Sequence, residues 1–122
     1  QQFRRVLETT EFREPAIRVL SNYTGKLHEP EPEAIRSRLF FQLFNPVRWF
    51  GCMNTAIDAG MDCIVEFGGG IGKGTSPDEK RPNLEGIVKK SLKWREHDAQ
   101  YLPAINAAGI RSAVRQLVAD QG

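Results

Sequence analysis

The sequence lacks a strong net charge, a long apolar run and a cysteine framework. Seventeen Lys and Arg residues nearly balance fifteen Asp and Glu residues, so the formal net charge is only +2 at pH 7. This balance favours neither nucleic acid nor an anionic membrane as a partner. No apolar run approaches the roughly 20 residues of a membrane span. The two cysteines, Cys52 and Cys63, indicate free thiols in a reducing compartment, and hence a cytoplasmic protein.

The motifs of several enzyme and binding classes are also missing. None of the five serines lies in a G-x-S-x-G nucleophile elbow. His28 has no partner at ligand spacing, so we expect it to be exposed to solvent and no metal to be bound. The glycine-rich segment 68–74 fits neither the Walker pattern nor the dinucleotide pattern, which weakens a nucleotide-binding interpretation. It is either a tight turn or a cradle of backbone N–H groups for an anion.

The 122 residues are enough for one globular domain or less. After residue 70, basic side chains exceed acidic ones by nine to six. That excess suits a phosphate-rich cofactor or an acidic protein partner as well as an ordinary solvated surface. The chain has no initial methionine and enters directly on a helical pattern, so we expect it to come from the middle of a longer protein.

Hydrophobic periodicity predicts an α/β fold with a parallel sheet. Short apolar, β-branched runs predict buried strands at 17–21 and 63–67, joined by helices as a βαβ unit. A third strand is expected at 100–105, where Pro103 restricts it to a sheet edge. Helices are expected over 2–12, 31–44 and 46–59, from Asn83 onward, and after Asn106, the last with Ile110, Val114, Leu117 and Val118 facing inward.

The stretch from Phe41 to Trp49 forms a corner between two of the expected helices. Asn45 is a good N-cap and Pro46 fits the first helical position, so the second helix is expected to begin there. Gly60 provides its C-terminal stop. On this pattern alone, the polar side chains of the corner satisfy local backbone groups.

Three motifs follow one another along the chain. Residues 21–25 read Ser-Asn-Tyr-Thr-Gly, residues 42–49 read Gln-Leu-Phe-Asn-Pro-Val-Arg-Trp, and residues 66–70 read Glu-Phe-Gly-Gly-Gly. In this order they resemble the malonyl-CoA:acyl-carrier-protein transacylases and the acyltransferase domains of polyketide synthases. The family has proline at the position of Gly69, so the third match is loose. The resemblance covers roughly residues 3–74 and divides the chain into an acyltransferase-like segment, 1–74, and an extension, 75–122, expected to pack on the same domain.

The resemblance implies the carboxyl-terminal part of the larger, α/β-hydrolase-like subdomain, with helices flanking a short parallel sheet. It implies transfer of a malonyl or related acyl group from coenzyme A, which is a substrate rather than a bound cofactor. The acceptor is the phosphopantetheine thiol of an acyl carrier protein, in fatty acid or polyketide synthesis. The partners are therefore malonyl-CoA, the carrier protein and the amino-terminal part of the acyltransferase.

The family's serine nucleophile and histidine base have no match here, so we expect this chain alone to be inactive. One supporting role carries over to Gln42. In the family, the backbone carbonyl at its position orients the catalytic histidine, which would lie outside this chain. Such a role is chemically reasonable, because a helix end leaves carbonyls available to an imidazole N–H. The alternative is a non-catalytic piece that docks a carrier protein or completes a split enzyme.

Overall fold

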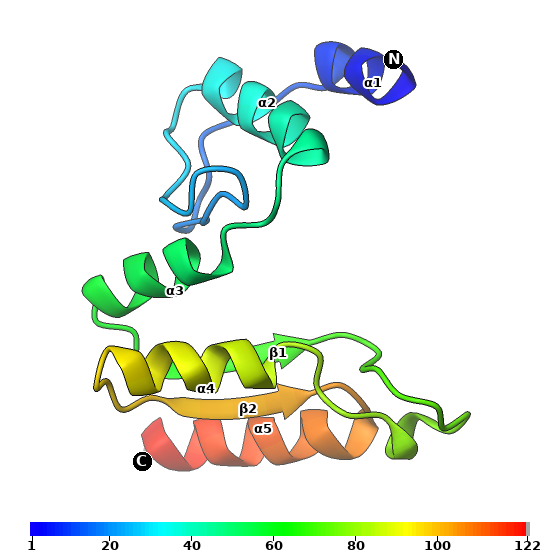
Figure 1. Cartoon of the computed structure of the whole chain (residues 1–122), viewed down its shortest axis with the longest axis vertical. Helices are drawn as coiled ribbons and strands as arrows, with labels where there is room; N and C mark the ends of the chain where they lie inside the picture. The colour runs from blue at the N-terminus through cyan, green and yellow to red at the C-terminus, as the bar shows by residue number, and fades with distance from the viewer. Residues whose placement is uncertain (122) are drawn as a thin grey trace. The chain divides into compact units, whose positions relative to one another are not determined.

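The computed structural model describes residues 1–121. They form two compact units, of which the first is helical and the second is α/β. Unit 1 runs to Ala59 and unit 2 begins at Gly60. Figure 1 labels the elements in chain order. Unit 1 holds α1 (Gln2–Thr9), α2 (Pro32–Phe41), the 3₁₀ turn η1 (Gln42–Phe44) and α3 (Trp49–Asp58), and unit 2 holds β1 (Cys63–Phe67), η2 (Pro77–Glu79), α4 (Glu85–Trp94), β2 (Gln100–Ala104) and α5 (Ala107–Gln121).

In unit 1, α1 packs against α2, and the buried residues of the two helices are Leu7 and Ile35. Arg36 of α2 caps the C-terminal end of α1. Its guanidinium donates to the carbonyls of Leu7, at 2.7 Å, and Thr10, at 3.1 Å. The last carbonyls of a helix have no intrahelical donor, so a side chain from the next helix supplies one. The two helices therefore share hydrogen bonds as well as apolar contact.

The predicted corner is present, but the second helix begins later than expected. α2 ends at Phe41, η1 follows, and α3 begins at Trp49 with Arg48 as its N-cap. Asn45 is extended, as the residue before a proline prefers, and its Nδ2 donates to the carbonyl of Phe41 at 2.8 Å. The prediction that Asn45 caps the second helix was wrong, because its side chain closes the preceding turn instead. Gly60, with φ +85°, is the expected C-terminal stop.

The strand predicted at residues 17–21 does not form. Among the described residues, its only ladder contact is a single antiparallel bridge between Leu20 and Leu27. Two backbone hydrogen bonds, from Ser21 N–H to the Lys26 carbonyl and from His28 N–H to the Val19 carbonyl, close a narrow loop. Ile17 is 77% exposed. A strand needs a neighbour along its length, and here the returning chain supplies one for only a few residues.

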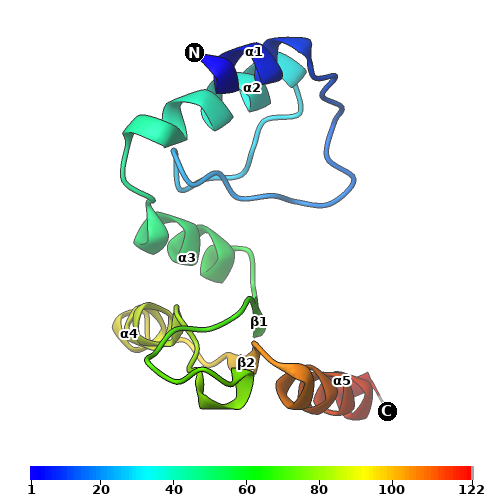
Figure 2. The ribbon, with the colours of Figure 1, turned by 90° about the vertical axis from the view of Figure 1, so that its right-hand side faces the viewer.

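Unit 2 contains a two-stranded parallel sheet with one helix on each face. β1 pairs with β2 from Cys63 opposite Gln100 to Phe67 opposite Ala104. Figure 2 shows α4 and α5 on opposite sides of these strands. The βαβ unit is therefore β1–α4–β2, not the predicted unit that began at residue 17. Pro103 lies in a strand at the sheet edge, as expected.

Helix α5 has the predicted cap but a different buried face. Asn106 Oδ1 accepts the N–H of Gly109 at 2.8 Å. A Cβ on Gly109 would come within 2.6 Å of the Pro103 carbonyl, and Ala113, one turn on, is buried in the core with Leu102 and Ala104. Gly109 and Ala113 thus allow α5 to lie close to β2 and form the buried face of the helix. The inward prediction was wrong for the larger side chains, which are 37–63% exposed: Ile110, Val114, Leu117 and Val118.

Candidate functional site

The first two motifs pack against each other in unit 1. Arg48 donates its backbone N–H to the carbonyl of Asn22 at 2.9 Å. Thr55, two turns along α3, donates its hydroxyl to the carbonyl of Gly25 at 2.6 Å. The turn at 21–25 is therefore hydrogen-bonded both to Arg48, just before α3, and to Thr55 within it. The chain makes a tight turn at Arg48, where the N–H of Trp49 bonds the carbonyl of Val47 at 3.0 Å, and α3 begins directly after it.

The contact is closest between two glycines. Gly25 has φ +68°, a conformation that glycine adopts without a Cβ penalty. A Cβ at Gly25 would lie 2.9 Å from the Cα of Gly51 in α3. Because the position of a Cβ is fixed by its own backbone and the Gly51 Cα is a backbone atom, no side-chain rotation could relieve that approach. The final glycine of the first motif is thus required twice, by its backbone conformation and by its neighbour.

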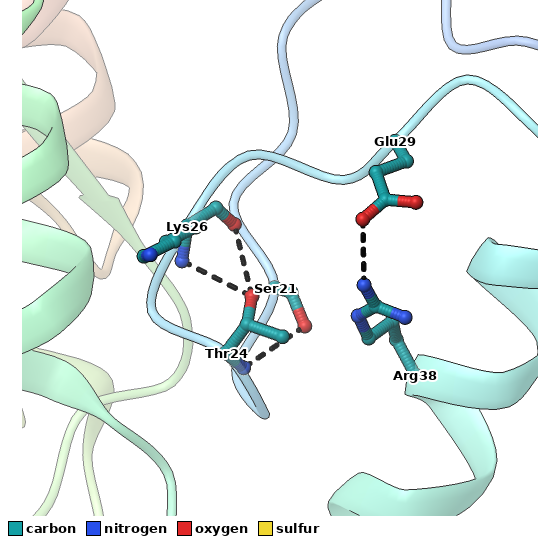
Figure 3. A network of polar contacts seen from close by, with 5 residues as sticks. All are labelled: Ser21, Thr24, Lys26, Glu29 and Arg38. Carbon is teal, nitrogen blue, oxygen red and sulfur yellow. Dashed lines mark hydrogen bonds and ion pairs between the residues drawn. The ribbon is translucent and has the colours of Figure 1, made fainter.

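The interior of the turn is held by hydroxyl groups, as Figure 3 shows. Ser21 is 1% exposed, and its Oγ accepts the N–H groups of Tyr23, at 3.2 Å, and Thr24, at 3.4 Å. Thr24 Oγ1 accepts the N–H of Lys26 at 3.2 Å. Ser and Thr hydroxyls characteristically bond nearby backbone in this way. The buried Ser21 hydroxyl is therefore a structural acceptor in this turn.

Gln42 lies at the junction where α2 tightens into η1. Gln42 is half-buried. Its backbone N–H is directed at the carbonyls of Arg38 and Phe40. Aromatic rings gather on this part of unit 1: Tyr23 stacks on Phe41 with 5.6 Å between centroids. The residue just before the second motif thus contacts the first motif through a ring pair. The orienting role of the Gln42 carbonyl remains a prediction.

The third motif places a carboxylate in the interior of unit 2. Glu66 is 8% exposed and is the one charged residue of β1. Its Oε2 accepts the N–H of Asn83 and its Oε1 accepts the N–H of Leu84, both at 2.8 Å. Oε1 also accepts the hydroxyl of Tyr101 on β2 at 2.6 Å. One carboxylate therefore joins both strands to the N-terminus of α4, where negative charge is favoured.

Burial and the hydrogen bond to Glu66 raise the pKa of Tyr101 well above its usual range. Its phenol is consequently a fixed donor at neutral pH. Glu66 belongs to the third motif of the sequence, but its hydrogen bonds were not predicted from that motif. The available signal was a lone acidic residue in an apolar strand, since such a group is rarely buried without donors around it.

The glycine-rich segment forms a closed turn after β1. Ile71 and Arg81 exchange two backbone hydrogen bonds of 2.9 Å. Lys80 Nζ donates to the carbonyl of Gly72 at 2.6 Å. Gly70, at φ +72°, lies so close to this bridge that a Cβ would meet the Arg81 carbonyl at 2.8 Å. These contacts favour the tight-turn interpretation over an open cradle.

Three further titratable groups, His28, Cys52 and Cys63, have shifted pKa values. His28 is half-buried, contrary to the prediction of an exposed side chain, because the loop around it folds back along residues 14–19. Burial and the nearby Arg38 guanidinium lower the pKa of His28. Burial raises the pKa of both thiols, and Asp62 adds to this effect at Cys63. Neither cysteine is thereby activated as a nucleophile.

Two classes of site are not found in residues 1–121. No group of three or more His, Cys, Asp or Glu side chains there is arranged to hold a metal ion. No helix in that range is both long enough and apolar enough to cross a bilayer.

Comparison with known proteins gives one informative similarity. No family model matches the chain. A PKS-NRPS hybrid synthetase, ATPKS, of Aspergillus niger is 38% identical over 65 residues. The matched stretch is 53% of this chain and 4% of the synthetase, so the chain spans a small part of that relative's length. Over about half of its residues, the chain is therefore similar to a region of a polyketide synthase.

Proposed function

We propose that this chain is the carboxyl-terminal part of an acyltransferase that transfers malonyl or a related acyl group from coenzyme A to an acyl carrier protein. The observation that carries the proposal is the packing of the first motif on the second and on α3 that follows it, with Arg48 N–H bonded to the Asn22 carbonyl and Gly25 against Gly51. Motifs that resemble one family in order, and that also interlock, are unlike chance matches. The similarity to a polyketide synthase region supports a role in polyketide synthesis.

In this proposal the chain positions groups and does not attack the thioester. A serine nucleophile and a histidine base belong to the amino-terminal part of the same acyltransferase. The carbonyl of Gln42 accepts the imidazole N–H and so selects the tautomer that can take the serine proton. Coenzyme A thioester is a substrate, no further cofactor is needed, and the reaction takes place in the cytoplasm. The parallel sheet of unit 2 extends the α/β-hydrolase-like subdomain.

Transfer of radiolabelled malonyl from malonyl-CoA to a carrier protein tests this function. The 122-residue chain is compared with the same chain extended upstream through a serine elbow. We expect denaturation-resistant labelling and transfer only with the extended protein, because covalent acyl transfer requires a nucleophile beside a base. Stoichiometric labelling of the short chain would refute the division of roles.

The role of Gln42 is tested in the extended protein. Gln42→Ala keeps the carbonyl and should lower kcat by less than about tenfold, or ~1.4 kcal/mol. Pro46→Gly loosens the corner and should lower it more. If Gln42→Ala abolishes turnover while Pro46→Gly has no effect, the side chain acts and the backbone assignment is wrong.

A second candidate is a non-catalytic subunit that docks a carrier protein or completes a split enzyme. The burial of the Ser21 hydroxyl and the raised pKa values of both thiols favour a chain without its own nucleophile. Mixing the chain with a separately expressed serine-containing part distinguishes the two. Restoration of transfer by mixing supports a split enzyme, whereas activity only in one continuous chain supports the first proposal.

A further inference from the structure

The outer edge of β2 is closed to a further strand. In a parallel pair, alternate residues of each strand bond across the ladder, and the others direct their N–H and C=O groups outward. Gln100 donates its N–H to the Asp62 carbonyl at 2.8 Å, so Gln100 faces β1. The outward residues of β2 are then Tyr101 and Pro103. Because proline has no N–H to offer, a new strand would find β2 a poor neighbour.

The outer edge of β1 has no such protection. The same alternation makes Cys63, Val65 and Phe67 its outward residues. Among the described residues, none forms a backbone hydrogen bond with these three on that side. β1 contains neither proline nor lysine, and Phe67 is 75% exposed. An open, apolar strand edge of this kind is a template for pairing with another chain.

An apolar stripe of α5 lies on the same side of unit 2. Its residues follow one another at helical spacing and are 37–54% exposed: Ile110, Val114 and Leu117. Leu117 borders the same hollow as Cys63, the first residue of β1. Gln116, on the other flank of the helix, bonds Gln100 of β2 at 2.7 Å. The stripe therefore faces the β1 side of the sheet.

The outward residues of β1 direct their side chains to the face that α5 covers. Cys63 and Val65 pack on the core that includes Ala113 of α5. Phe67 lies two residues beyond Val65, so its side chain is on that face as well. The edge of β1, the Phe67 ring and the α5 stripe thus form one apolar surface, here called the β1 edge surface.

We propose that the β1 edge surface pairs with the same surface of a second copy of this chain. A two-fold axis normal to the sheet makes the two β1 strands antiparallel. It sets Val65 opposite Val65 of the second copy, and Cys63 opposite Phe67. In this register every outward N–H and C=O of the three residues finds a partner. The inference is independent of the proposed function.

The pairing brings no like charges together. Asp62 faces Gly68 of the second copy, and Glu66 faces Ile64. Both copies of α5 then cover one face of a four-stranded sheet, above strands that are three spacings, or about 14 Å, apart. The two α5 stripes face each other across this space, and the Phe67 rings fill it.

The strength of the dimer follows from its size. A stable complex buries about 800 Å² on each partner. One five-residue strand edge and four partly exposed side chains offer less than this. We therefore expect a dimer that dissociates on dilution, with a dissociation constant in the micromolar range.

Sedimentation velocity of the 122-residue chain over a range of concentrations measures this dimer. Phe67→Lys places a charge on the edge and should raise the dissociation constant at least tenfold. Val114→Lys, on the α5 stripe, should also raise it. Ile17→Lys is the matched control, because Ile17 lies in unit 1 and is about as exposed as Phe67, at 77%. It should change the constant by less than about twofold, and circular dichroism checks that all three variants fold.

Hydrogen exchange followed by NMR tests the strand pairing itself. Exchange of the Val65 and Phe67 amides should slow as the concentration rises, because their N–H groups gain acceptors, while the outward amide of Tyr101 should be unaffected. A chain that is monomeric at every concentration would overturn the proposal and leave the edge to a strand of a different chain. A dimer weakened as much by Ile17→Lys as by Phe67→Lys, or one that leaves both β1 amides unprotected, would overturn it too.

Discussion

Replacing Gly25 by alanine tests whether the first motif docks on α3 as described. A non-glycine residue in the left-handed region costs about 1–2 kcal/mol. The new Cβ, 2.9 Å from the Gly51 Cα, adds an overpacking cost of about 1–3 kcal/mol. Alanine also lowers the conformational entropy of the unfolded chain, which offsets this destabilisation by about 0.4–1 kcal/mol. We therefore expect Gly25→Ala to lower the free energy of unfolding by about 2–4 kcal/mol.

Gly60→Ala is the control that separates strain from collision. Gly60 also has positive φ, at +85°, but a Cβ there would meet nothing within 4 Å. It should cost only the conformational part, about 1 kcal/mol after the entropy correction. Urea unfolding followed by Trp49 fluorescence, in a Trp94→Phe background, measures both variants. Equal destabilisation by the two substitutions would refute the close packing of Gly25 on Gly51.

Two further predictions concern buried ionisable groups. Glu66→Gln should lower the free energy of unfolding by about 1–3 kcal/mol, because backbone donors of Asn83 and Leu84 lose a charged acceptor; Tyr101→Phe, which removes one bond of the set, should cost less in the same urea titration. His28 has a lowered pKa in the fold, so its contribution is full above the ordinary value of 6.5 and is lost as pH falls through the folded pKa. The urea midpoint should therefore drop between pH 7 and pH 5, and His28→Gln should flatten that drop; an unchanged slope would contradict the burial of this ring.

Local patterns in the sequence were sufficient where short-range physics decides the structure. The apolar run at 63–67, the glycine stop at residue 60 and the cap at Asn106 are all as predicted. Long-range contacts decided the rest. The run at 17–21 has strand composition, but among the described residues it makes only a single bridge, from Leu20 to Leu27, and closes a loop instead.

The same limit applies to helix faces and to the site. Periodicity assigned the large apolar side chains of α5 to the interior, but close packing at Gly109 turned Ala113 inward. Spacing also could not reveal that the Arg48 N–H bonds the Asn22 carbonyl, or that Glu66 collects donors from the N-terminus of α4 and from β2. Each of these depends on a neighbour distant in sequence, and a pattern along the chain contains no such distance.

The parallel pairing of β1 with β2 has a consequence for the rate of folding. Every rung of this ladder joins residues separated by the whole glycine turn and α4. None of its hydrogen bonds can form until that long segment has closed, whereas α4 and α5 need only local contacts. We infer that the helices of unit 2 form first and that strand pairing limits its folding rate. Because closure cost rises by only about 0.6 kcal/mol for each doubling of loop length, insertions between residues 75 and 82 should slow folding only slightly.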